Sequence, residues 1–154
     1  MTFPKARLAV SACLLIAWLL YLGYLVYQTR DVVILSKPQF MVARAYVIVD
    51  IRQGGRLDIP SEDVTFEKVL WQANPNGNLQ AGQQLHVAIL AECRKENGYH
   101  GPGKYLLPLL RAVPPYLIAP APRILEGRPA PIVVIYPWTP ETEAQLKPFL
   151  EAKK

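Results

Sequence analysis

The chain has 154 residues, of which 51% are hydrophobic and 19% are charged, and its formal net charge is +5. Three of the 17 basic residues, Lys5, Arg7 and Arg30, flank one apolar segment, so the rest of the chain is nearly balanced against its 12 acidic residues. This balance indicates an ordinary solvated surface and argues against a phosphate-binding role. The two cysteines, Cys13 and Cys93, lie in different parts of the chain, which excludes a domain held by disulfides.

Residues 8–27, LAVSACLLIAWLLYLGYLVY, form an apolar run without a charged residue. A helix of this length reaches about 30 Å, the thickness of the hydrocarbon core of a bilayer. A signal peptide is the first alternative, but no small-residue cleavage pattern precedes or follows Tyr27. A lipoprotein signal is the second alternative, but too few apolar residues precede Cys13. We therefore expect a single uncleaved transmembrane helix over residues 8–27.

The short tail before the helix, residues 1–7, contains Lys5 and Arg7. Positively charged flanks stay on the cytoplasmic side of a membrane. The sequence therefore predicts a cytoplasmic tail and a C-terminal part that lies outside the cytoplasm. Residues 28–39 are predicted to form a tether that leads into the domain.

Residues 40–119 show the alternation of apolar and polar residues that is typical of β-strands. We predict a mostly β fold, a small antiparallel barrel or sandwich. The predicted strands span residues 45–51, 63–71, 84–90, 104–110 and 116–119. The residues predicted to share its interior are Val47, Val49, Val64, Phe66, Leu85, Val87 and Leu107, and the alternation also points Ile89 inward.

Residues 120–154 are predicted to form a proline-rich connector, a strand and a short C-terminal helix that pack on the barrel. The connector, residues 120–131, is expected to be extended, and the strand follows at 132–136. The helix begins after Thr139, which is a good N-cap residue and precedes a proline. Pro148 is expected to shorten or kink this helix.

Four segments of the domain resemble a known barrel family. They read A-x-V-I-V-x-I at 45–51, V-x-F-x-K-V-L at 64–70, a glycine-led strand at 82–89, and G-K-Y-L-L-P-L at 103–109. In this order they resemble the netrin-like OB barrel, the fold of the tissue inhibitors of metalloproteinases. The resemblance implies an OB-like barrel over residues 40–119. Those inhibitors bind the protease zinc through an N-terminal cysteine, and this chain has an apolar helix there instead, so the resemblance does not imply protease inhibition.

His86, Cys93 and His100 are the soft metal-ligand candidates of the domain. Structural zinc sites usually contain close pairs of ligands, whereas these residues are widely spaced. Cys93 with either histidine could also form a nucleophile and its base, but no local motif supports this. We therefore predict no catalytic residue, no metal site and no cofactor. The alternative is a hydrolase or metal-binding accessory protein that uses these three residues.

The segment around Tyr136 and Trp138 holds two aromatic rings between prolines, which makes it a candidate interaction surface. The competing interpretation is that Trp138 caps the open end of the barrel and seats the C-terminal helix. The sequence thus predicts a non-enzymatic, single-pass membrane protein whose domain serves interaction or scaffolding. Its expected partner is another envelope or membrane protein, and nucleic acid is not expected as a partner.

Overall fold

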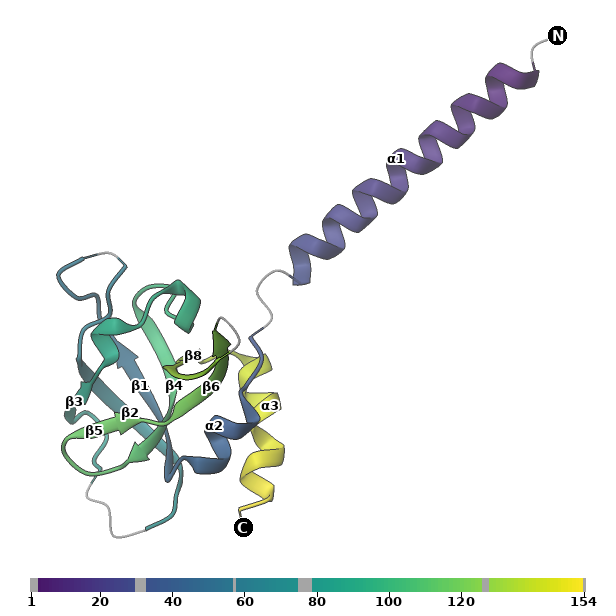
Figure 1. Ribbon diagram of the computed structural model, residues 1–154. Coiled ribbons are helices and arrows are strands. Elements are labelled where there is room, and N and C mark those ends of the chain that lie inside the picture. The colour runs from purple at the N-terminus through teal and green to yellow at the C-terminus, as the bar shows by residue number, and fades with distance from the viewer. Residues whose placement is uncertain (1–2, 30–32, 57, 75–78, 126–127, 154) are drawn as a thin grey trace. The chain divides into compact units, whose positions relative to one another are not determined.

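The computed structural model describes residues 3–29, 33–56, 58–74, 79–125 and 128–153. The chain forms two compact units, Met1–Val32 and Val33–Lys154. The first contains the helix α1, Phe3–Thr29 (Figure 1).

Within α1, the run Ala9–Tyr27 is long and apolar enough to cross a membrane, and none of it is buried. Its length and composition fit either a membrane anchor or a secretion signal. The flanking Arg30 and the side chains of Lys5 and Arg7 lie outside the described residues.

The second unit is built on a closed barrel of five strands, which confirms the predicted barrel. Neighbours in it follow the order β1-β2-β3-β5-β4, and β4 pairs with β1 to close the ring. Each of the five predicted strands is present, although β3 ends earlier than expected. Their bounds are β1 Ala45–Ile51, β2 Asp63–Gln72, β3 Gln84–Ala88, β4 Gly103–Arg111 and β5 Tyr116–Ile118.

The barrel is mostly antiparallel, as expected, and contains one parallel pair of strands. β3 and β5 run parallel, with Val87 opposite Tyr116, while the other pairs of the barrel are antiparallel. The direction of β5 follows from the closure. The closing pair of β4 with β1 is antiparallel, and β5 is antiparallel to β4, so β5 runs in the same direction as β1 and β3.

One face of every strand lies inside the barrel and forms the interior cluster. All seven residues predicted to share this interior are in it. Val47, for example, is fully buried opposite Leu107 of β4. The alternation of the strands therefore predicts the inward face correctly. The buried members are Ala45, Val47, Val49, Ile51, Val64, Phe66, Leu85, Val87, Leu90, Cys93, Tyr99, Tyr105, Leu107, Leu109, Tyr116, Ile118 and Ile135.

Two helices, α2 at Lys37–Val42 and α3 at Pro140–Glu151, lie on one side of the barrel and cover part of its outer face (Figure 1). Between them and the strands lies an outer cluster, whose buried members are Leu35, Phe40, Ala43, Tyr46, Leu106, Ala119, Tyr136 and Leu146. The ring of Phe40 lies 5.1 Å from that of Tyr46 and 5.4 Å from that of Phe149. This cover explains why β1 is buried on both faces.

The strands β6, Pro120–Leu125, and β7, Arg128–Val133, pair as an antiparallel hairpin, rather than forming the single extended connector that we expected. The predicted strand at 132–136 is also divided, because its end belongs to β8, Tyr136–Pro137, which pairs with β4.

The helix α3 begins as predicted, with the Thr139 hydroxyl accepting a hydrogen bond from the Thr142 amide at 3.2 Å. It continues through Pro148 to Glu151. Helix and strand occupy similar shares of the chain, since α1 alone has 27 residues.

Candidate functional site

The three candidate ligands, His86, Cys93 and His100, occupy different environments. The His86 side chain is 61% exposed on β3, with its Nδ1 3.0 Å from the Asp63 carboxylate. His100 is exposed in the loop before β4, whereas Cys93 is buried in the interior cluster. Across the described part of the chain, no group of three or more His, Cys, Asp or Glu side chains could hold a metal ion.

Tyr136 and Trp138 both lie against the outer cluster. Tyr136 is buried, and its hydroxyl donates to the Gln39 side-chain oxygen at 2.6 Å and accepts from the Ser36 amide at 3.1 Å. Trp138 is partly buried, and its amide donates to the Lys104 carbonyl at 2.8 Å. Trp138 therefore offers the exposed surface of the pair, while Tyr136 is an internal hydrogen-bonding group.

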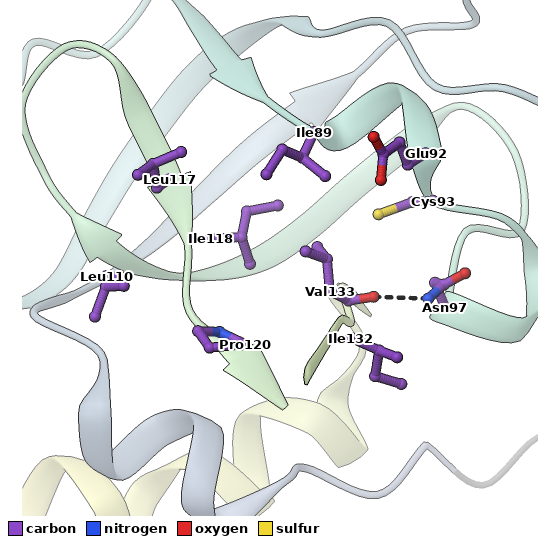
Figure 2. Close-up of a pocket in the computed structure, with 10 residues that line it drawn as sticks. All are labelled: Ile89, Glu92, Cys93, Asn97, Leu110, Leu117, Ile118, Pro120, Ile132 and Val133. Carbon is purple, nitrogen blue, oxygen red and sulfur yellow. Dashed lines mark hydrogen bonds between the residues drawn. The ribbon is translucent and has the colours of Figure 1, made fainter. Parts of the chain in front are cut away.

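A pocket of about 540 Å³ lies beside the barrel, between the ends of its strands and the β6–β7 hairpin. Most of its lining is aliphatic. In Figure 2, Leu110 and Leu117 lie toward one end, and Glu92, Cys93 and Asn97 toward the other. Pockets of this size and lining hold small ligands in many proteins. The lining residues are Ile89, Glu92, Cys93, Asn97, Leu110, Leu117, Ile118, Pro120, Ile132 and Val133.

Ile89 sets the shape of one wall. Its φ of 70° lies in the left-handed region, which ends β3 and turns the chain into a short helix, η1, Leu90–Glu92. The predicted inward position of Ile89 is wrong, because this turn places Leu90 in the interior and leaves Ile89 41% exposed at the pocket. A β-branched residue in this conformation costs about 1–3 kcal/mol, and such strain concentrates at functional sites.

The β6–β7 hairpin forms the other wall of the pocket. The second short helix, η2, Lys95–Asn97, is hydrogen-bonded to the end of this hairpin and to the residues after it. The Asn97 side-chain amide donates to the Val133 carbonyl at 2.8 Å, the dashed line in Figure 2. The Asn97 carbonyl accepts from the Ile135 amide at 2.9 Å. Gly98 follows with a φ of 92°, and a Cβ there would lie 2.0 Å from the Ile135 carbonyl oxygen. Only glycine allows this approach.

The Cys93 thiol at the polar end of the pocket is not set up as a nucleophile. Burial, reinforced by the Glu92 carboxylate, raises its pKa to about 12, and the opposing charge of Arg94 is the smaller effect. The Arg94 guanidinium is directed to the backbone, where it donates to the carbonyls of Ala91 and Cys93 at 2.7 and 2.9 Å. The thiol is therefore protonated at neutral pH, and thiolate chemistry is disfavoured. The arrangement suits apolar binding better than covalent catalysis.

This pocket was not found by reasoning from the sequence. Leu110 and Leu117 sit at positions where the alternation of β4 and β5 points side chains out of the barrel, and that exposure of leucines could have indicated a second apolar surface. Ile132 and Val133 reach the pocket because β6 and β7 pair as a hairpin, whereas the proline-rich sequence predicts an extended connector.

No protein-family model, no curated protein and no solved structure matches this chain.

Proposed function

We propose that this chain is a non-enzymatic binding module, held at a membrane by an uncleaved N-terminal helix, with its barrel outside the cytoplasm. The observation that carries the proposal is the largely aliphatic pocket of about 540 Å³, whose thiol is buried and protonated. Such a pocket recognises an apolar group through the hydrophobic effect. Its role is then interaction or scaffolding beside other proteins of the same membrane.

Binding to an apolar probe tests the pocket. Residues 33–154 form a compact unit, and Nile red should bind them saturably with a rise in fluorescence. Leu117→Gln should weaken this binding about tenfold or more, because burying a leucine side chain contributes about 1.5–3 kcal/mol. Ile34→Gln is the matched control, since Ile34 is 76% exposed and does not line the pocket. Equal binding by the two variants would contradict the proposal.

Retention of the helix is supported by the length of its apolar run and by the lack of small residues near Tyr27. The intact mass of the protein isolated from membranes tests it. We expect a chain that still contains α1, and a mature N-terminus between residues 12 and 40 would contradict the proposal.

The orientation rests on Lys5 and Arg7 in the tail before α1. A reporter enzyme that is active only in the cytoplasm, fused after Lys154, should be inactive. Activity of this reporter would reverse the orientation.

We also propose that the barrel is of the OB type. The small barrel has five strands in the order β1-β2-β3-β5-β4, with β4 pairing with β1, and five-stranded small barrels are typical of the OB fold. These features support the netrin-like resemblance at the level of the fold.

A further inference from the structure

A second hollow, of about 400 Å³, adjoins the pocket. It lies where β1 begins and where β2 and β4 end, and its lining includes Arg44, Asn74, Arg111 and Val113. Leu110 lines both this hollow and the apolar pocket. The two depressions therefore share a wall at a single exposed leucine.

The backbone brings the two arginines to this hollow. The Arg44 amide donates to the Leu109 carbonyl at 2.7 Å, which fixes Arg44 beside the end of β4. Arg111 is opposite Leu117 in the β4–β5 pairing. Arg111 lines the hollow and Leu117 lines the apolar pocket. The cationic hollow and the apolar pocket are thus neighbours through the backbone as well as through Leu110.

The charge of this hollow is not neutralised within the described structure. Arg44 and Arg111 are both exposed, and neither guanidinium group has a hydrogen bond or ion pair with another described residue. Arg94 differs, because its guanidinium donates to two carbonyls and lies 3.9 Å from Asp58. Guanidinium groups without partners are available to bind a carboxylate or a phosphate.

The opposite end of the apolar pocket has the opposite charge. Glu92 lines that end, away from Leu110 (Figure 2). An anionic group would be repelled there and attracted at the arginine end. The charges therefore give the combined site a direction, with the anion at Arg44 and Arg111 and the apolar part toward Ile118 and Cys93.

We infer that the pocket and the hollow together form one site for a single-chain anionic amphiphile. Its alkyl chain would lie in the pocket, and its carboxylate or phosphate would bind Arg44 and Arg111. This inference rests on the proposed function, since it names the ligand of the same pocket. The membrane that holds α1 would be the source of such a ligand.

Photolabelling of the full chain in phosphatidylcholine nanodiscs tests the inference. The probes are a long-chain fatty acid with a diazirine near the end of its chain, the corresponding lysophosphatidic acid, and the corresponding neutral alcohol. We expect saturable labelling by the two anionic probes on peptides that contain Leu117, Ile118 or Ile132. Labelling by the acid alone or by the phosphate alone would identify which head group is bound.

The double variant Arg44→Gln, Arg111→Gln should weaken labelling by the anionic probes about tenfold or more, because it removes both charged hydrogen-bond donors of the head group. It should leave labelling by the alcohol unchanged. The double variant Arg52→Gln, Arg56→Gln removes two exposed arginines that line neither depression and is the matched control.

Two results would overturn the inference, and they have different meanings. Equal pocket labelling by acid and alcohol, unaffected by the Arg44 and Arg111 changes, would reject the anionic ligand and leave the apolar pocket as the binding site. The absence of saturable pocket labelling with every probe, together with the absence of Nile red binding, would reject the proposed function as well.

Discussion

The interior cluster and the outer cluster pack on opposite faces of the same strands, yet different interactions specify them. The interior is apolar apart from a few polar atoms, and the buried Tyr99 hydroxyl has no hydrogen-bond partner among the described residues. The outer cluster is organised around the fully buried Gln39. Its amide donates to the carbonyls of Ala119 and Val134 at 2.7 and 2.9 Å. Burial alone can shape the interior, whereas the outer cluster depends on matched polar pairs.

Lys153 adds a charged group to the polar interactions of the outer cluster, whereas the described members of the interior cluster include no charged residue. Lys153 Nζ lies 3.9 Å from the centre of the Trp71 ring and donates to the carbonyls of Phe40 and Ala43 at 3.2 and 3.1 Å. Burial lowers the pKa of this lysine. Two carbonyls and an aromatic face are the partners that a partly desolvated ammonium group needs.

The largest expected effect is on the interior. Phe66→Ala should lower the free energy of unfolding of residues 33–154 by about 3–5 kcal/mol, because it removes a buried ring and leaves a cavity. His86→Ala, on the exposed face of the barrel, should change it by no more than about 0.5 kcal/mol. Denaturant unfolding measures both. A His86 variant as damaging as the Phe66 variant would place His86 in a buried site.

The next effect is on the outer cluster. Gln39→Leu keeps the approximate volume of the side chain but removes the donor to the Ala119 and Val134 carbonyls and the acceptor of the Tyr136 hydroxyl. This should cost about 2–4 kcal/mol. Gln84→Leu is the control, since Gln84 is exposed on β3. If the two variants had the same stability, the polar network would not determine the packing of this cluster.

A pair of hydroxyl deletions compares the two clusters directly. Tyr136→Phe removes a hydroxyl with two hydrogen bonds and should cost about 1–2 kcal/mol. Tyr99→Phe removes a buried hydroxyl without a described partner and should leave stability unchanged or raise it by up to about 1 kcal/mol. Thermal or denaturant unfolding tests this, and a reversed order would contradict the contrast between the clusters.

The smallest effect is a pH dependence in the interior. The ordinary pKa of 9.0 applies to Cys93 in the unfolded chain, and burial raises the pKa to about 12 in the folded chain. The folded thiol therefore keeps its proton while the unfolded thiol loses it. The resulting stabilisation is complete below pH 9 and is lost as the pH rises toward 12. Between pH 9 and 10 the loss is about 1 kcal/mol.

Cys93→Ala tests this through the slope of stability against pH, and the comparison between variants cancels the titration of the tyrosines. The variant should be less pH-dependent than the unchanged unit over pH 9 to 10. Identical slopes would mean that the thiol is accessible to solvent in the folded state.

Much of the barrel could be predicted from the sequence, because the alternation of apolar and polar residues is visible within each strand by itself. Val47, Phe66 and Leu107 show the alternation in their own strands, and Thr139 shows the helix start beside its own proline. The outer cluster could not be predicted in the same way. The sequence around Gln39 gives no sign of its role, because its hydrogen-bond partners, Ala119 and Val134, lie far along the chain.

The pocket escaped prediction for a related reason. One wall depends on the left-handed backbone at Ile89, an isoleucine in a conformation that its side chain disfavours. The other wall depends on the β6–β7 hairpin, whose proline-rich sequence indicated an extended connector. The second hollow lies between the beginning of β1 and the ends of β2 and β4. Its two arginines, Arg44 and Arg111, are brought together only by the β1–β4 pairing that closes the barrel.

The closure of the ring also determines when the domain can fold. β1 needs β4 as a neighbour, and β3 needs β5, so a chain emerging from its N-terminus has open sheet edges until Tyr116–Ile118 has been made. Partners so far apart in sequence place folding on the millisecond-to-second scale, as in other small barrels. The barrel can therefore be completed only after β5 has been synthesised. Until then its unpaired strand edges are open to aggregation and need protection.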